Sequence, residues 1–139
     1  MASWCERNGF ENSADHFFKQ AQEERSHMLK LYRYILDLGG TAVSPEVVNI
    51  KHEFNSFREV FEEALEQEIA ITQSFNNIVD RCHKVKDFVT IDFLSWFLKE
   101  QVEEEYVARR ALELFDVIGE EGIGRWTIDK NIPKIAYNQ

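Results

Sequence analysis

Long helical repeats of apolar residues constrain the fold of this chain more than any other feature of its sequence. Apolar residues recur every three or four positions over residues 12–38, 56–84 and 88–118, the spacing that places them on one face of an α-helix. Each such helix would be roughly 40 Å long at about 1.5 Å per residue, which exceeds the usual helix of a globular domain. The sequence therefore predicts an all-α protein built as a helix bundle.

Local signals mark the ends of these predicted helices. Asn12 is a candidate N-cap for the first long helix, and Ser56 with Glu59 fits a capping box at the start of the second. The third is expected to begin near Asp87 and to stop at Gly119, because glycine commonly ends a helix.

The connections predict the topology of the bundle. Residues 1–8 precede a short turn, so this piece is expected to run antiparallel to the first long helix. The link from Gly40 to Asn55 has about 16 residues and could span roughly 50 Å when extended, enough to return along the bundle. We expect one domain over residues 1–139: a four-helix bundle with one long crossover and a short helix near residues 127–132.

Polar residues interrupt the apolar stripes at one common height of the predicted bundle. Glu24, Glu68, Gln101 and Glu104 occupy stripe positions near the middle of three helices, where an unpaired carboxylate is costly to bury. His27 follows Glu24 by three residues on the same helix face, the Glu-x-x-His spacing of di-iron bundles. Carboxylates with one imidazole suit iron or manganese better than zinc, and the sequence predicts a metal site, most simply one for two irons.

Other charged and histidine residues carry weaker signals. Glu23, Glu100 and Glu103 flank the predicted ligands, and the residues alone leave two readings open, a solvated face or a neighbouring cation site. Four further glutamates of the two later helices are expected to be plain surface charge: Glu62, Glu63, Glu66 and Glu105. Three histidines without partner spacing are also expected on the surface: His16, His52 and His83.

Composition excludes several classes of function. The formal net charge of −9 and the pI near 4.9 argue against a nucleic-acid partner, which requires a basic surface. No apolar run is long enough to span a membrane, and no secretory signal is visible. Cys5 and Cys82 have no metal-binding spacing and are expected to be free thiols. We therefore expect a cytoplasmic protein that handles cations.

Together these segments resemble the bacterial non-haem ferritins. The resemblance extends over essentially the whole chain and rests on QEERSHM at 22–28, EIAITQ at 68–73, FLSWF at 93–97 and EQVEEE at 100–105. It implies a ferritin-like fold, a homo-oligomeric shell of 24 subunits, oxidation of Fe(II) to Fe(III) by O2 or peroxide, and storage of a ferric mineral inside the shell.

The resemblance also implies a role for each candidate residue. Glu24 would bridge two irons and His27 would bind the first of them. Glu68 and Glu104 would bind the second iron, and Gln101 would lie beside the position where oxygen binds. Three further glutamates fall on the family's third iron site: Glu23, Glu100 and Glu103.

Two departures separate the chain from the related bacterioferritins. Their second Glu-x-x-His is replaced here by the segment from Gln101 to Glu104, and Arg25 stands where their haem-binding methionine would be. No haem is therefore expected.

A third departure concerns the first bundle helix. Residues 1–8 supply only about two turns of it, so the family's glutamate ligand and tyrosine on that helix have no counterpart, and we expect a fragment or a wrongly chosen start. Two functions follow as expectations: a ferroxidase subunit of an iron-storage ferritin, or a catalytically impaired subunit that only binds iron or builds the shell. A ferritin-like oxidase of an organic substrate is a weaker third reading.

Overall fold

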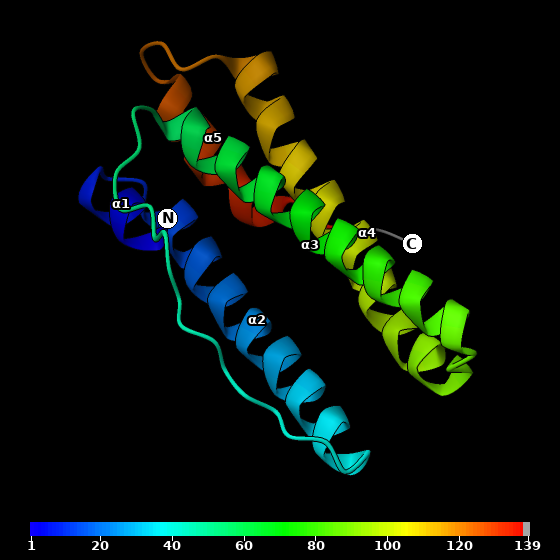
Figure 1. Cartoon of the computed structure of the whole chain (residues 1–139). Helices are drawn as coiled ribbons and strands as arrows, with labels where there is room; N and C mark the ends of the chain where they lie inside the picture. Colours follow the sequence, from blue (N-terminus) through cyan, green and yellow to red (C-terminus); the bar gives the residue numbers. More distant parts are fainter. Residues whose placement is uncertain (138–139) are drawn as a thin grey trace. The chain divides into compact units, whose positions relative to one another are not determined.

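The computed structural model describes residues 1–137, and all of the regular structure in this range is helical (Figure 1). Five α-helices are followed by one 3-10 turn, Ile132–Lys134. The helices are α1 (Ala2–Arg7), α2 (Glu11–Asp37), α3 (Phe57–Val85), α4 (Phe88–Ile118) and α5 (Gly124–Asn131). The chain forms two compact units, Met1–Phe54 and the part from Asn55 onward, and the expectation of one domain stays a prediction.

The first unit consists of α1, α2 and the link that follows α2. Gly9 has a φ of +81°, a conformation that glycine adopts without steric cost, and the chain reverses there between α1 and α2. Asn12 is not the N-cap of α2: the helix begins at Glu11, after Phe10, with no side-chain cap. The ring of Phe10 stacks on Trp4 at 6.2 Å between centroids, so packing rather than a polar cap holds the start of α2.

The link after α2 runs back along that helix, as its length allows (Figure 1). Near its end, Glu53 pairs with Arg7 of α1 at 2.8 Å, and Phe54 meets the ring of Trp4 at 5.8 Å. The link thus brings the chain back from the C-terminal end of α2 to its N-terminal end, as a crossover connection must.

The second unit is built on the antiparallel pair α3 and α4. Ser56 caps α3, since its Oγ accepts a hydrogen bond from the backbone N–H of Glu59 at 3.0 Å, so the predicted cap is confirmed. Lys86 is in the left-handed conformation (φ +61°), and Asp87 then caps α4 by accepting from the N–H of Thr90 at 3.1 Å. A turn this short forces α4 back along α3.

Aromatic side chains fill the interior between α3 and α4. Phe57 and Phe61 both contact the ring of Phe115, at 5.0 and 5.5 Å, and Phe75 stacks on Phe97 at 5.1 Å. These five rings are at most 9% exposed. They lie on both sides of the polar residues described below, so the apolar core brackets a polar layer.

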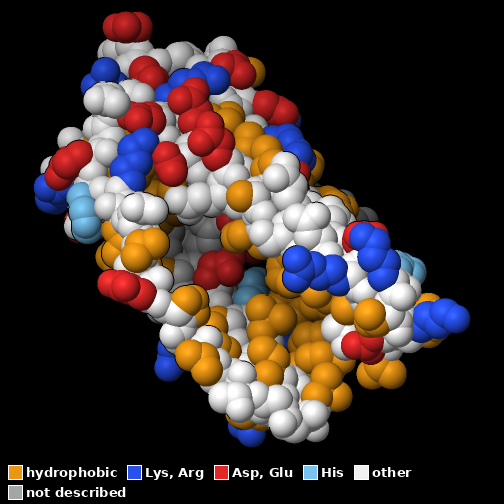
Figure 2. All heavy atoms as spheres, in the orientation of Figure 1, with side chains coloured by type: hydrophobic (Ala, Val, Ile, Leu, Met, Phe, Trp, Pro, Cys, Tyr) orange, Lys and Arg blue, Asp and Glu red, His pale blue; other side chains and the backbone are white. Residues whose placement is uncertain are grey.

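The apolar stripe of α2 is buried only at its beginning. Ala14 and Phe17 are in the core, but Met28, Ile35 and Leu38 are 41%, 38% and 62% exposed. The second half of this stripe therefore lies on the surface of the described structure. Figure 2 shows apolar side chains gathered in the lower part of this face, where the C-terminal half of α2 lies.

The C-terminal helix α5 starts earlier than predicted. It begins at Gly124 rather than near Thr127, and Pro133 falls within the 3-10 turn that follows it. Cys5 and Cys82 form no disulfide within residues 1–137, in agreement with the prediction of thiols, and both are buried. Within residues 1–137, no helix combines the length and the apolar character needed to cross a bilayer.

Candidate metal centre

The first part of the candidate centre is the Glu-x-x-His pair on α2. The helix places Glu24 and His27 on one face, with His27 Nδ1 3.5 Å from Glu24 Oε2. The imidazole is 13% exposed, whereas the Glu24 side chain as a whole is 41% exposed. The other carboxylate oxygen, Glu24 Oε1, is buried and has no hydrogen-bond partner among the residues that the structure describes.

The unpartnered oxygen of Glu24 indicates whether the Glu24–His27 pair is suited to bind a metal. Burying a carboxylate oxygen without a partner costs free energy, and in native structures such a group calls for an explanation, of which a bound ion is one. A cation such as Fe(II) would supply the missing interaction, with an imidazole nitrogen three residues away as a further donor. The donor set on α2 therefore fits iron.

The second part is a buried polar layer between α3 and α4. Glu68 and Gln101 are only 6% and 4% exposed. Gln101 Nε2 donates to Glu68 Oε2 at 3.1 Å and lies 3.2 Å from the backbone oxygen of Glu68. The prediction that these two residues lie at the same height on neighbouring helices is confirmed. Glu104 follows Gln101 by three residues and is half-buried.

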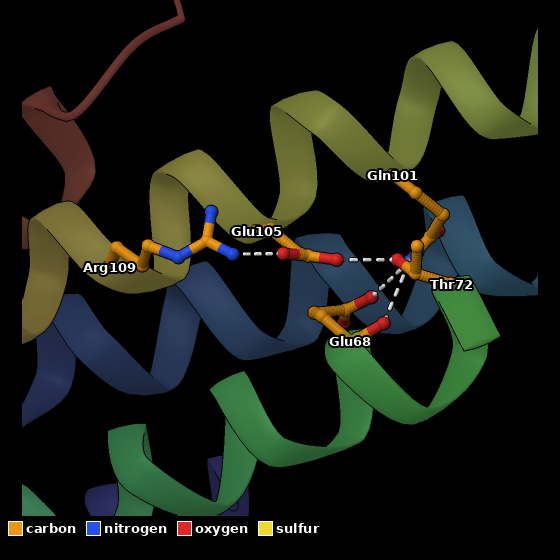
Figure 3. Close-up of polar contacts among 5 residues, drawn as sticks. All are labelled: Glu68, Thr72, Gln101, Glu105 and Arg109. Atoms are coloured by element: carbon orange, nitrogen blue, oxygen red, sulfur yellow. Dashed lines mark hydrogen bonds and ion pairs between the residues drawn. The ribbon is translucent and has the colours of Figure 1, made fainter.

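Sequence reasoning missed the extension of this layer through Thr72, Glu105 and Arg109 (Figure 3). Thr72 Oγ1 lies 3.4 Å from Gln101 Nε2 and 2.6 Å from Glu105 Oε1, and Glu105 Oε2 pairs with Arg109. The expectation that Glu105 is plain surface charge is wrong, because its side chain is only 14% exposed. One signal was available: Glu105 follows Gln101 by one helical turn, which keeps it near the same face.

The residues of the predicted third cation site differ in exposure. Glu23 and Glu103 are exposed and Glu100 is half-buried. Glu100 and Glu103 are three residues apart on α4, whereas Glu23 is on α2 in the other compact unit. Their role in binding iron stays a prediction.

Over residues 1–137, the structure brings no three His, Cys, Asp or Glu side chains together in an arrangement that could hold a metal ion. The candidate ligands are divided between the two compact units, Glu24 and His27 in the first and Glu68, Gln101 and Glu104 in the second. The complete ligand set therefore stays a prediction, and each part is described by itself.

The histidines other than His27 also differ from one another. His52 and His83 are exposed, as predicted. His16 is not a plain surface residue: it is half-buried beside the ring of Phe17 at 5.3 Å. Burial lowers the pKa of His16 below its ordinary value, and the nearby charge of Lys19 lowers it further.

Comparison with known sequences gives a consistent set of relatives. The model of a family described as "Ferritin-like domain" matches residues 1–118. A bacterial non-heme ferritin of Staphylococcus saprophyticus is 37% identical over 139 residues, which cover 100% of this chain and 83% of the relative. A probable bacterial non-heme ferritin-like protein of Haemophilus influenzae is 35% identical over 136 residues, or 98% of this chain and 82% of the relative.

Solved structures give the same result for the fold. An open pore ferritin from the archaeon Archaeoglobus fulgidus matches with a TM-score of 0.91 and 31% identity, over 95% of this chain and 81% of that one. A ferritin from Chlorobium tepidum matches with a TM-score of 0.84 and 36% identity, over 96% of this chain and 83% of that one.

Proposed function

Because this chain belongs to the ferritin family, we propose that it is an iron-storage ferritin subunit that binds Fe(II) and oxidises it to Fe(III). Its fold is all-α and ferritin-like, as the sequence predicted. The observation that carries the proposal is the buried oxygen of Glu24, which has no partner within residues 1–137 and belongs to a Glu-x-x-His pair.

Each candidate residue has a distinct role in the proposal. Glu24 offers two carboxylate oxygens and bridges two Fe(II) ions, and His27 binds the first of them. Glu68 and Glu104 supply oxygen ligands to the second, and Gln101 lies beside the position of the oxidant. Negative carboxylates offset the charge of the cations, and the helix pair α3 and α4 holds its ligands in place before iron arrives.

Fe(II) is the substrate in this reaction, and its electron balance is simple. Two Fe(II) each lose one electron, and O2 gains two electrons and two protons to give hydrogen peroxide; with peroxide as oxidant, the same two electrons and two protons give two water molecules. The iron carries the redox chemistry, while the protein supplies donor atoms and their geometry.

The wider setting of the subunit follows from the family and is part of the proposal. The subunit assembles with copies of itself into a shell that stores ferric mineral, in the cytoplasm and without haem. Arg25 supports the last point, because it stands where a haem-binding methionine would be. Glu23, Glu100 and Glu103 bind a third iron, and iron enters or leaves the first two positions through this third one.

Aerobic Fe(II) oxidation followed by stopped-flow absorbance tests the proposal. Glu24→Ala and His27→Ala are each expected to slow the reaction by at least about 100-fold, beyond the 10–100-fold loss typical of residues that only support ligands. Glu66→Ala is the matched control, since Glu66 is an exposed glutamate on α3 and should leave the rate unchanged. Equal rates in the wild type and both ligand variants would refute the proposal.

A second candidate function is an iron-binding subunit without its own ferroxidase activity. It is favoured by one observation: residues 1–137 contain no ready cluster of three protein ligands. Such a subunit would bind Fe(II) and co-assemble with active subunits. Fast oxidation by this chain alone would refute this second reading, whereas Fe(II) binding without oxidation would support it against the first.

A further inference from the structure

The side-chain amide of Gln101 is surrounded on one side by three oxygen atoms. Nε2 lies 3.1 Å from Glu68 Oε2, 3.2 Å from the backbone oxygen of Glu68 and 3.4 Å from Thr72 Oγ1. The first two are acceptors only, as a carboxylate and a carbonyl oxygen. Thr72 is the one neighbour that could either donate or accept, so its hydroxyl can either reinforce or oppose the amide orientation that the two Glu68 oxygens favour.

The proton of the Thr72 hydroxyl is already committed. Thr72 Oγ1 lies 2.6 Å from Glu105 Oε1, and a carboxylate can only accept, so Thr72 donates its single proton to Glu105. Arg109 pairs with the second oxygen of the same carboxylate, Glu105 Oε2, which favours the charged form and fixes its orientation. Thr72 can therefore only accept from Gln101 (Figure 3).

An amide flip would then bring oxygen against oxygen. Turning Gln101 by half a rotation would place its Oε1 against Glu68 Oε2, the Glu68 carbonyl and Thr72 Oγ1, none of which has a proton to give. The NH2 end is thus held toward Glu68 and Thr72, and the carbonyl oxygen Oε1 is held on the opposite side of the amide. Amide nitrogen cannot bind a metal ion in this form, whereas amide oxygen can.

We propose that Thr72, Glu105 and Arg109 are positioning residues that, together with the oxygens of Glu68, hold the orientation of the Gln101 amide, so that its carbonyl oxygen and not its NH2 group is turned toward the proposed position of Fe(II) and its oxidant. This inference rests on the proposed function and deepens it. The three residues do not touch iron; they act through the hydrogen bonds that they make to one another and to Gln101.

A purely structural role for Thr72 makes a different prediction from a positioning role. Valine has nearly the shape of threonine but no hydroxyl, and serine has the hydroxyl but no methyl group. If Thr72 mattered only for packing between α3 and α4, Thr72→Ser would be the more damaging change. If its hydroxyl orients Gln101, Thr72→Val is the more damaging change and Thr72→Ser restores function.

The test uses the full chain and Co(II), a divalent ion that reports its ligands by visible absorption and does not require oxidation. Calorimetry is expected to give about 10-fold weaker Co(II) binding for Thr72→Val, within the range typical of residues that orient ligands. Thr72→Ser should stay within about 2-fold of the wild type. Glu105→Gln should resemble Thr72→Val, because a glutamine can donate to Thr72, which frees the Thr72 proton and removes one of the acceptors that hold the NH2 end of Gln101 in place.

Glu113→Gln is the matched control for Glu105→Gln. Glu113 is also a glutamate of α4 paired with an arginine of the same helix, Arg110, but it is exposed and three turns from Gln101. It should leave Co(II) affinity and spectrum unchanged. Thermal melting of the metal-free variants separates a loss of binding from a loss of folding: Thr72→Val should still unfold cooperatively, well above the temperature of the binding measurement.

Two results would overturn the inference, and they are distinguishable. Wild-type affinity and spectrum in Thr72→Val, or weaker binding by Thr72→Ser than by Thr72→Val, would refute the positioning role while leaving the proposed function intact. A wild-type chain that binds neither Co(II) nor Fe(II) would refute the proposed function and this inference with it.

Discussion

Glu68 and Gln101 are buried between α3 and α4 and hydrogen bond to each other, whereas the buried Oε1 of Glu24 on α2 has no partner within residues 1–137. The polar layer between α3 and α4 is thus already hydrogen-bonded before a metal binds, so burying it costs little free energy in the metal-free protein. The Glu24 side chain is 41% exposed, but its buried Oε1 lacks a hydrogen-bond partner among the described residues and stays unsatisfied without a cation. A glutamate on an apolar stripe can therefore be hydrogen-bonded within the protein, as Glu68 is, or have an oxygen left for a ligand to bind, as Glu24 has.

The two units also differ in how far the apolar stripes of their helices are buried. The stripes of α3 and α4 are buried at Phe57, Phe61, Phe97 and Phe115, but the second half of the α2 stripe is exposed. Stability of the described fold should accordingly depend far more on α3 and α4 than on the C-terminal half of α2. The following predictions test this comparison.

The largest effect is expected from a truncation in the α3–α4 core. Phe61→Ala removes a ring that is 1% exposed and in contact with Phe57 and Phe115, and it should lower the free energy of unfolding by about 3–5 kcal/mol. Leu36→Ala on α2 is the control; Leu36 is 52% exposed, and its loss should change the free energy by no more than about 0.5 kcal/mol. Urea denaturation followed by circular dichroism measures both, and similar effects would contradict the comparison.

A smaller loss is expected from the polar layer. Gln101→Leu removes the donor to Glu68 Oε2 and leaves a buried carboxylate with fewer hydrogen bonds, so the metal-free protein should lose about 1–3 kcal/mol. Thermal unfolding in the presence of a chelator measures the change. An unchanged or raised melting temperature would show that the layer does not stabilise the metal-free fold.

The start of α3 gives the next effect. Ser56→Ala deletes the side chain that caps the N–H of Glu59, and this should cost about 1 kcal/mol. Ser56→Asp keeps an acceptor at the N-cap and should retain most of the stability. No difference between the two variants in urea midpoint would argue against the cap, in contrast to α2, whose start has no side-chain cap to lose.

A change of opposite sign is expected at Glu24. Glu24→Met removes the buried oxygen that has no partner in the described part of the chain, so the metal-free protein should keep its stability or gain up to about 1 kcal/mol. The same change should abolish the rise in melting temperature that Fe(II), added anaerobically, gives the wild type. A clear loss of metal-free stability would mean that Glu24 is already satisfied without a cation.

The smallest effect is a pH dependence that belongs to the first unit. Since the folded pKa of His16 is lowered, the unfolded chain binds a proton that the folded chain does not, and stability should fall as pH drops below the ordinary value of 6.5. His16→Gln should reduce this slope between pH 7.5 and 5.5, measured by urea midpoints, whereas substitution of the exposed His83 should not. A slope unaffected by His16→Gln would contradict the assignment.

Much of the fold could be predicted from the sequence, because helix periodicity and capping are local. The cap at Ser56 and the turn before Asp87 follow from residues within four positions of one another. Asn12 was predicted wrongly as a cap, since the packing of Phe10 on Trp4 outweighed the local signal. The start of α5 was placed about three residues too late. Local preference is weak against such contacts.

For the candidate centre, too, some contacts follow from residue spacing and others do not. Counting along antiparallel helices is enough to bring Glu68 and Gln101 to one height, and the structure confirms this contact. Counting does not reveal that Glu105 is shielded, because exposure depends on what the neighbouring helix places beside it. Thr72 supplies that neighbour.

By itself the sequence determined that this chain is all-α, where α3 and α4 meet, and which turns of α2, α3 and α4 have polar residues on an apolar stripe. These properties follow from a repeat of 3.6 residues and from short connections. Only the tertiary structure decided that Gln101, Thr72, Glu105 and Arg109 form one chain of hydrogen bonds and that Glu24 Oε1 has no partner within residues 1–137. The physical reason is that a hydrogen bond depends on the direction and protonation of two side chains from different turns or helices, and residue spacing does not fix either one.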